Sequence, residues 1–179
     1  MQDEMSKPEI SESTRTGPES SIAVRRILVP VDASPCCLEA TKTAASLASA
    51  LEASITVLHA YHPMLELGSA LAGATISTAS GEMTLIDHMR REAQKTVDEH
   101  VERLREMGVA ATGRLVEGPA KAMIVSSIEE GDFDLVVMGT HGRTGLAHLL
   151  MGSVAEWVVR HAPVPVLTVH DTKEPAQVA

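Results

Sequence analysis

Apolar and polar positions along the chain change their period several times, and these changes predict alternating strands and helices. Short apolar runs rich in Val, Ile and Leu are typical of buried strands, whereas apolar residues that recur every three or four positions indicate helices with one buried face. Strands are expected at residues 26–32, 54–60, 109–116, 134–139 and 164–169, and helices at 35–51, 83–107, 118–131 and 153–161. Strands separated by helices of this length pair in parallel through right-handed crossovers.

This alternation predicts an α/β fold. We expect an open five-stranded parallel sheet with helices on both faces, Rossmann-like, with strand order 3-2-1-4-5. Ligands of such sheets bind beyond the carboxyl ends of the strands, where the winding direction of the chain reverses. Candidate ligand contacts therefore follow the first, second and fourth strands: Asp32, residues 59–61 and the loop after Met138.

The sequence divides into one domain and two tails. Residues 25–170 are expected to form the α/β domain. Residues 1–24 mix Ser, Thr, Glu and Pro without apolar periodicity and are expected to be a flexible tail, as are residues 171–179 after the last apolar run. Inside the domain, the stretch 62–81 is expected to be a mobile loop. Ser34 is expected to cap the first helix, with Pro35 at its first position.

Composition and charge exclude several classes of function. Apolar residues make up 44% of the 179 residues, with one Trp, one Tyr and one Phe, so Val, Ile, Leu, Ala and Met must fill the core. A formal charge of -9 argues against nucleic acid as a partner, because phosphate backbones attract a surplus of Lys and Arg. No apolar run approaches the ~20 residues that span a membrane, and the polar N-terminus lacks the apolar centre of a signal peptide. We therefore expect a cytoplasmic protein without membrane contact.

A loop punctuated by glycines follows the fourth expected strand and carries the strongest chemical signal. Gly139 and Gly142 remove side chains where a ligand would approach the backbone. Gly152 and Ser153 stand at the start of the next helix, where free N–H groups and the helix dipole attract an anion. The dipole alone contributes only ~0.3–2 kcal/mol. Several donors must therefore act together, which suits a di- or triphosphate.

Two further side chains of the loop could add to such a phosphate site. Arg143 and His141 could each donate to a phosphate, although a solvent-facing turn position explains His141 equally well. The glycines could also serve only to make turns. Because they flank a strand-to-helix transition at the expected ligand edge, turn formation and phosphate binding carry about equal weight on these residues alone.

The spacing of this loop is Gly-x-x-Gly, nine residues, then Gly-Ser, and with it the chain resembles the nucleotide-binding branch of the universal stress protein family. Residues 27–32 resemble the first strand of that family, 57–60 its second strand and 160–167 the approach to its last strand. The resemblance covers residues 25–170. It implies an adenine nucleotide α-hydrolase-like fold with ATP as the ligand.

By this resemblance, three residues surround the adenine and ribose of the nucleotide: Pro30, Asp32 and Ala60. Asp32 is implied to accept hydrogen bonds from the sugar or base region. Met138 and Gly139 are implied to border the ribose and the first phosphate. Relatives often carry the bulkier valine at the position of Ala60, which implies a looser adenine contact in this chain.

The resemblance also implies a phosphate path, a metal and a partner. Gly142, Gly152, Ser153 and Val154 would line the phosphate path, and Mg²⁺ would be held mainly by the phosphates themselves. The resemblance also implies a homodimer, in which the last strands of two copies, Val164 to Val169, pair with each other. An edge strand with unpaired backbone groups is a natural partner for its own copy. The alternative is an edge shielded by the C-terminal tail.

The cysteines and histidines give weaker signals. Cys36 and Cys37 are neighbours, which rarely meet the geometry of a disulfide, so reduced thiols are expected. Their position early in a helix could lower a thiol pKa, which leaves redox sensing as an alternative to plain packing. The histidines are dispersed and no His-Glu-x-x-His helix occurs, so no metal ligand is assigned.

The sequence therefore predicts an ATP-binding, nucleotide-dependent regulatory or stress-response protein. No residue resembling a general base or a water-positioning acid lies in the loop, so no catalytic residue is assigned and at most a weak ATPase is expected. Two alternatives stay open. One is an interaction module of the same fold with a non-functional pocket, and the other is a slow ATPase.

Overall fold

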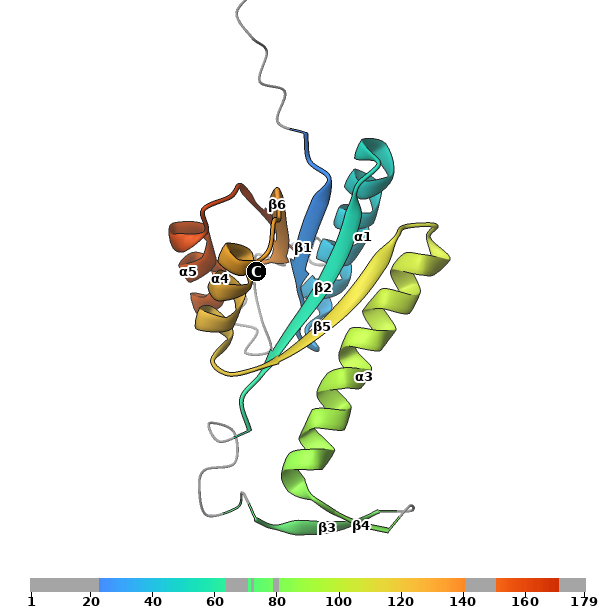
Figure 1. Cartoon of the computed structure of the whole chain (residues 1–179), viewed down its shortest axis with the longest axis vertical. Helices are drawn as coiled ribbons and strands as arrows, with labels where there is room; N and C mark the ends of the chain where they lie inside the picture. Colours follow the sequence, from blue (N-terminus) through green and yellow to red (C-terminus); the bar gives the residue numbers. More distant parts are fainter. Residues whose placement is uncertain (1–22, 64–70, 72, 79–80, 141–150, 171–179) are drawn as a thin grey trace, which may run out of the picture.

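The computed structural model describes residues 23–63, 71, 73–78, 81–140 and 151–170, and its centre is a five-stranded parallel sheet. The strands are β1 (Arg26–Pro30), β2 (Ser54–Tyr61), β5 (Ala111–Glu117), β6 (Leu135–Gly139) and β7 (Val166–Val169). The helices of the described ranges are α1 (Pro35–Leu51), α3 (Leu85–Glu106), α4 (Ala120–Glu130) and α5 (Ser153–His161). Figure 1 shows how the helices flank the sheet.

The expected fold class is confirmed, and the strand order is β5-β2-β1-β6-β7. This order carries different numbers from the expected 3-2-1-4-5 because two strands of a separate hairpin, β3 (Thr75–Thr78) and β4 (Gly81–Thr84), precede β5 in the chain. When the hairpin strands are left out of the count, the two orders agree. The reversal of winding direction lies between β1 and β6, which pair in parallel at the centre.

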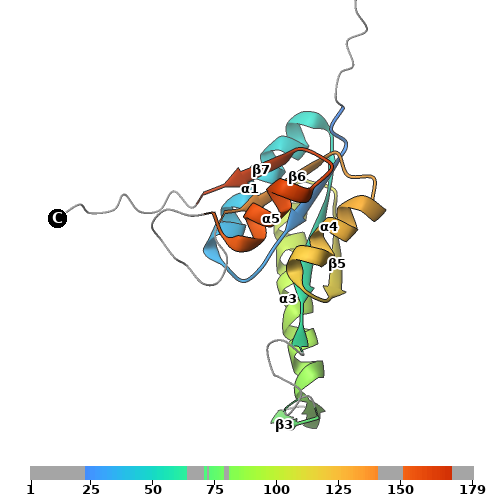
Figure 2. The same ribbon diagram turned by 90° about the vertical axis from the view of Figure 1, so that its left-hand side faces the viewer.

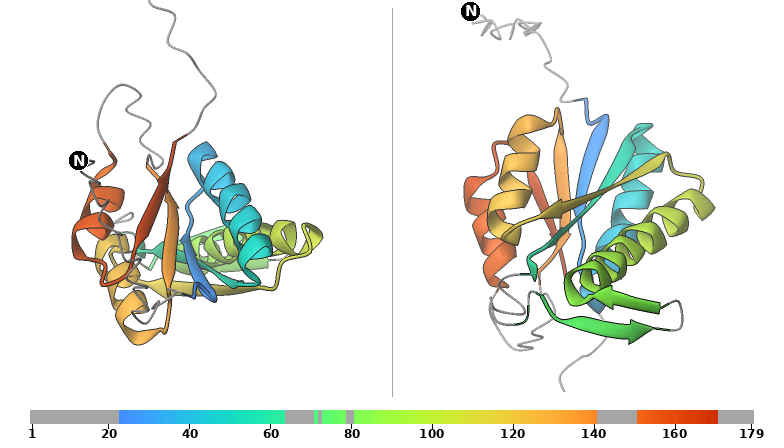
Figure 3. Two further views of the ribbon diagram at one scale, coloured as in Figure 1. Left: turned by 90° about the horizontal axis from the view of Figure 1, so that it is seen from above. Right: turned by 60° about the horizontal axis from the view of Figure 1, so that its bottom comes forward.

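Helices cover the two faces of the sheet in pairs. Because side chains alternate across a strand, Ile27 and Val29 of β1 pack into a core with α1 and α3, whereas Leu28 packs into a second core with α4 and α5. All three side chains are fully buried. In Figure 3 (left), α1 and α3 lie on one side of the strands and α4 and α5 on the other. Val31, just after β1, belongs to the first core, and Met138, near the end of β6, belongs to the second, so each core holds residues at the carboxyl edge.

The stretch expected to be a loop, residues 62–81, contains part of a hairpin, which corrects that expectation. β3 and β4 pair antiparallel, with Thr75 opposite Thr84. The N–H of Leu85 donates to the carbonyl oxygen of Ala74 at 2.8 Å, so the hairpin leads directly into α3. Three of the four residues of β3, Thr75, Ile76 and Thr78, are β-branched, which favours this extended backbone. The hairpin lies at one end of α3, apart from the main sheet (Figure 2).

The same segment shifts the expected start of the long helix from residue 83 to Leu85. Thr84 is the N-cap, and its hydroxyl accepts a hydrogen bond from the Asp87 N–H at 3.1 Å. A side-chain oxygen at this position satisfies one of the backbone donors that the first turn leaves without a helical partner.

At the amino edge of the sheet, one carboxylate joins β1 to β6. Asp134 Oδ2 accepts hydrogen bonds from the N–H groups of Arg25 and Arg26 at 2.8 and 2.9 Å. These two bonds hold the pKa of Asp134 below its ordinary value. Asp132 forms a surface ion pair with Arg26 at 3.1 Å. Both acids therefore have local structural roles at the edge opposite to the expected ligand site.

The expected tails, residues 1–24 and 171–179, lie outside the described residues except for Ala23 and Val24. Val24 packs against the core that α1 and α3 form with the sheet. Within the described ranges, none of the helices combines the length and the apolar character that crossing a bilayer requires.

Candidate functional site

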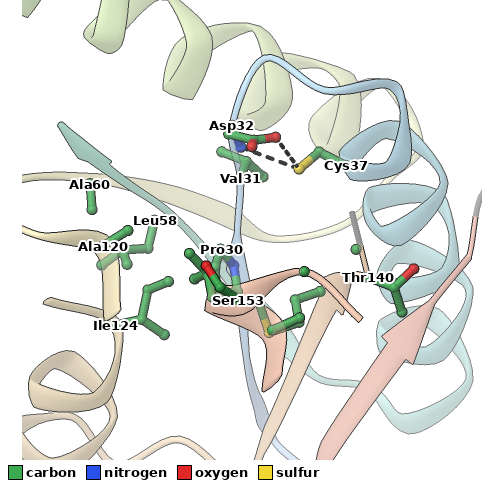
Figure 4. A pocket seen from close by; sticks show the side chains of 15 residues that line it. Pro30, Val31, Asp32, Cys37, Leu58, Ala60, Ala120, Ile124, Thr140 and Ser153 are labelled. Carbon is green, nitrogen blue, oxygen red and sulfur yellow. Dashed lines mark hydrogen bonds between the residues drawn. The ribbon is translucent and has the colours of Figure 1, made fainter. Parts of the chain in front are cut away.

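A cavity of about 300 Å³ lies at the carboxyl edge of the sheet, beside the ends of β1, β2 and β6. The beginnings of α1, α4 and α5 complete its walls (Figure 4). Its lining consists of Pro30, Val31, Asp32, Cys37, Leu58, Ala60, Ala120, Ile124, Met138, Gly139, Thr140, Gly152, Ser153, Val154 and Ala155. The position agrees with the rule that ligands of open parallel sheets bind where the winding direction reverses.

The cavity brings together eight of the residues that sequence reasoning selected. They are Pro30, Asp32, Ala60, Met138, Gly139, Gly152, Ser153 and Val154. These residues come from four separate parts of the chain and meet in one place. The other three selected residues, His141, Gly142 and Arg143, lie outside the described residues. Contact of any of these residues with a ligand stays a prediction.

Sequence reasoning missed part of the lining. The missed residues are Val31, Cys37, Leu58, Ala120, Ile124, Thr140 and Ala155. Strand alternation could have identified Leu58, which lies two residues before Ala60 on the same face of β2. Helical spacing links Ala120 to Ile124 in the same way. Nothing in the sequence signals that Cys37 reaches the cavity, because that depends on how α1 leaves β1.

One wall of the cavity is polar and centres on Asp32, which lies just after β1. Its Oδ1 accepts the Ser34 N–H at 3.0 Å and the Cys37 thiol at 3.0 Å. The Cys37 sulfur in turn accepts the Asp32 N–H at 3.2 Å and the Ser34 hydroxyl at 3.4 Å. The expected capping role of Ser34 is therefore wrong in one respect. Ser34 is the N-cap of α1, but its side chain makes no capping hydrogen bond.

Both cysteines are buried free thiols, as expected. Burial, and then the negative charge of Asp32, raise the pKa of the Cys37 thiol to about 12. The position in the first turn of α1 therefore does not lower this pKa, which removes the physical basis for Cys37 as a reactive redox sensor. Cys36 points elsewhere, and its thiol donates to the Val169 carbonyl oxygen at 3.0 Å.

The start of α5 forms another part of the cavity wall. Gly152 is the N-cap of this helix, and no side chain caps it. Its N–H donates to the Thr140 carbonyl oxygen at 2.6 Å, while the Thr140 N–H donates to the Val169 carbonyl oxygen at 2.9 Å. These bonds tie the helix start to the ends of β6 and β7. The exposed Ser153 and the first N–H groups of α5 thus form a fixed set of hydrogen-bond donors, suited to an anion.

Two histidines form hydrogen bonds to groups next to the cavity. The Nδ1 of His59 lies 2.6 Å from the Val31 carbonyl oxygen, so this nitrogen must carry the proton. His100 of α3 is buried, and its Nδ1 lies 2.8 Å from Thr41 Oγ1. Because the Thr41 hydroxyl donates to the Cys37 carbonyl oxygen at 2.7 Å, it accepts from His100. Burial, followed by the charge of Arg103, lowers the pKa of His100, so a neutral ring links α3 to the first turns of α1.

The arrangement combines an apolar slot, one carboxylate and a helix N-terminus. Leu58, Ile124 and Met138 supply apolar surface of the kind that covers a flat ring. Asp32 can accept hydrogen bonds, and the start of α5 can donate them to an anion. In the part of the chain that the structure describes, no three His, Cys, Asp or Glu side chains gather closely enough to hold a metal ion.

An open parallel α/β sheet with a cavity at its carboxyl edge, beside the ends of β1, β2 and β6 and the start of α5, has the architecture of the doubly wound class. Residues 23–170 match the model of the Universal stress protein family. The chain therefore belongs to the universal stress protein family.

Curated and solved relatives agree with this assignment. A universal stress protein of Methanocaldococcus jannaschii, MJ0531, is 32% identical over 151 residues, which cover 84% of each chain. A solved universal stress protein in complex with cAMP has a TM-score of 0.61 at 25% identity, covering 83% of this chain and 98% of that one. The universal stress protein of Archaeoglobus fulgidus in complex with dAMP has a TM-score of 0.59 at 22% identity, covering 82% and 98%. Some solved members of the fold thus bind adenine nucleotides.

Proposed function

We propose that this protein binds ATP in the cavity at the carboxyl edge of its sheet and acts as a nucleotide-dependent regulatory or stress-response protein. The observation that carries the proposal is the meeting of eight residues from four parts of the chain around one cavity. The lining combines apolar side chains, a carboxylate and a helix N-terminus. A nucleotide combines matching parts: a flat base, a sugar with hydroxyl groups and a chain of phosphates.

Each part of the lining suits one part of ATP. The apolar residues Leu58 and Ile124 would cover the adenine, and Asp32 would accept hydrogen bonds from the ribose or the base. Ser153 and the N–H groups at the start of α5 would donate to the phosphates. Because the described residues offer no cluster of metal ligands, Mg²⁺ would be held mainly by the phosphates. His141, Gly142 and Arg143 are proposed to extend the phosphate path.

The relatives support an adenine nucleotide as the ligand class. The solved relatives described above are complexes with cAMP and dAMP, which share the adenine ring and a phosphate with ATP. A triphosphate is proposed for this chain because its glycine spacing, Gly139 and Gly142 followed by Gly152 and Ser153, is intact.

The wider biological proposals rest on the same reasoning. We propose residues 25–170 as the functional domain, with residues 1–24 and 171–179 as tails, and the cytoplasm as its location. A homodimer would form through the last strand, residues 164–169. β7 is at one end of the strand order, and Leu167 of this strand is 38% exposed, which favours pairing with a second copy.

Binding can be tested directly on the purified protein. Denaturation followed by chromatography and mass spectrometry would identify any nucleotide that the protein retains. Titration calorimetry with ATP, cAMP and inorganic triphosphate would then compare ligands. We expect Asp32→Ala to weaken ATP binding while leaving the affinity for inorganic triphosphate unchanged, because Asp32 lies away from the start of α5.

Asp132→Ala is the matched control for this experiment. Asp132 is a surface acid whose side chain is 84% exposed, at the edge of the sheet opposite to the cavity. Removing it should leave ATP affinity unchanged, since an exposed ion pair contributes little. The absence of any detectable binding at millimolar ATP by the unmodified protein would overturn the proposed function.

A further inference from the structure

The buried thiol of Cys37 is the hydrogen-bond partner of the carboxylate in the cavity. Its side chain lies in the first turn of α1, and the residue is 5% exposed. The thiol donates to Asp32 Oδ1 at 3.0 Å, and Figure 4 shows the two side chains facing each other on one wall. The Asp32 N–H donates back to the sulfur at 3.2 Å. Asp32 and Cys37 thus hold one another through two opposed hydrogen bonds.

These contacts leave the two oxygens of Asp32 in different situations. Oδ1 accepts both the Cys37 thiol and the Ser34 N–H, each at 3.0 Å. Among the described residues, none donates to Oδ2. A carboxylate held by one oxygen has a fixed orientation, and its second oxygen keeps its capacity to accept hydrogen bonds. Because Asp32 lines the cavity, this capacity is available to a bound molecule.

We propose that Cys37 is a positioning residue for ligand recognition: its thiol fixes the Asp32 carboxylate so that Oδ2 is presented to the hydroxyl or amino groups of a bound nucleoside. This inference rests on the proposed nucleotide site. In this proposal Cys37 does not itself recognise the nucleoside, and it has no redox role. The thiol acts through Asp32, and its loss would leave the Ser34 N–H as the donor that holds Oδ1 among the described residues, so the carboxylate would be held less firmly.

The chemistry of the thiol suits this role. A thiol can donate only while it is protonated, and burial beside Asp32 keeps the pKa of Cys37 near 12. The proton is therefore present throughout the neutral pH range. A hydrogen bond to a carboxylate is stronger than one between neutral groups, which favours a fixed carboxylate orientation. The Ser34 hydroxyl, 3.4 Å from the sulfur, donates to it and leaves the thiol proton for Asp32.

Substitutions at Cys37 separate positioning from packing. Cys37→Ala removes the donor and leaves space, Cys37→Val removes the donor and fills the space, and Cys37→Ser keeps a donor. We expect the first two variants to bind ATP about ten-fold more weakly, equivalent to about 1.4 kcal/mol. We expect Cys37→Ser to recover most of the affinity. Inorganic triphosphate, which has no nucleoside, should bind all variants as it binds the unmodified protein.

The neighbouring thiol provides the matched control. Cys36→Ala removes a buried thiol from the same helical turn, but Cys36 donates to Val169 and does not line the cavity. Its ATP affinity should stay within about two-fold of the unmodified protein, a difference of less than half a kcal/mol. A double-mutant cycle adds a second measurement. In an Asp32→Ala background, Cys37→Ala should cause no further loss, because the group that Cys37 positions is absent.

The outcomes distinguish this inference from the function on which it depends. Normal ATP affinity in both Cys37→Ala and Cys37→Val would overturn the positioning role, while ATP binding itself stood. Equal losses for ATP and inorganic triphosphate would also overturn it, since they would indicate a general distortion of the cavity. No ATP binding by the unmodified protein would overturn the proposed function and this inference together.

Discussion

Replacing Gly139 with alanine would push β6 against the first turn of α1. A Cβ atom at this position would lie 2.9 Å from the Sγ of Cys36, 3.1 Å from its Cβ and 3.2 Å from its carbonyl carbon. The sulfur could turn away, but only by giving up its hydrogen bond to Val169. The other two atoms cannot move without the helix. The substitution therefore forces a shift where strand, helix and cavity meet.

The cost can be estimated from two opposing effects. Extra volume in a packed region costs about 1–3 kcal/mol. The backbone of Gly139 does not have a positive φ, so alanine fits its conformation, and a less flexible unfolded chain offsets about 0.4–1 kcal/mol. With the middle of each range, the net loss is roughly 1.3 kcal/mol. At about 2–4 °C per kcal/mol for a domain of this size, Tm should fall by about 3–5 °C.

Urea unfolding followed by circular dichroism measures this loss, and an unchanged m-value would confirm that the folded surface is preserved. Gly73→Ala is the control, because a Cβ there meets no atom within 4 Å and the φ is not positive. We expect Gly73→Ala to be neutral or slightly stabilising. Gly139→Ala should also bind ATP more weakly, since residue 139 lines the cavity. Equal stability of the two variants would refute the packing argument.

Three further predictions concern pH and packing. Burial lowers the pKa of His100 below 6.5, so the free energy of unfolding should decrease as the pH drops below about 6.5. Urea titrations from pH 5 to 8 should show a smaller decrease for His100→Gln. Asp134 has a pKa below 3.8, so its contribution is present above that pH and lost in more acidic solution. In an acid titration, the stability of Asp134→Asn should therefore depend less on pH in this acidic range than that of the unmodified protein. Gly113→Ala would press a Cβ against Val97 and should lose about 1–3 kcal/mol in urea unfolding.

Most of the main sheet and of its helices could be predicted because their signals are local and strong. The apolar run at residues 26–32 and the period of residues 83–107 each determine an element by themselves. The hairpin could not be predicted in this way. β3 and β4 are four residues long, and the connection Ala79-Ser80 lacks the Asn-Gly or Asp-Gly signature of a tight hairpin. Such short strands are defined by their pairing, which a local pattern does not record.

The residues of the candidate site likewise differ in whether a local pattern identifies them. Gly139, Gly152 and Ser153 have a fixed spacing within one connection, so the sequence alone selects them. Cys37 is five residues after Asp32, and it meets the carboxylate only because α1 begins at once and turns back toward β1. The position of Cys37 early in a helix instead suggested a lowered thiol pKa. Burial and the adjacent negative charge of Asp32 raise that pKa.

The hairpin has a practical consequence for engineering. Its strands pair with one another in a sheet of their own, while the five strands that hold the cavity are registered independently. A change in the length of β3 and β4 would therefore leave the strand register around Asp32 and Gly139 unaltered. New chain termini from circular permutation, or an inserted reporter peptide, could be placed in this hairpin while the cavity stays intact.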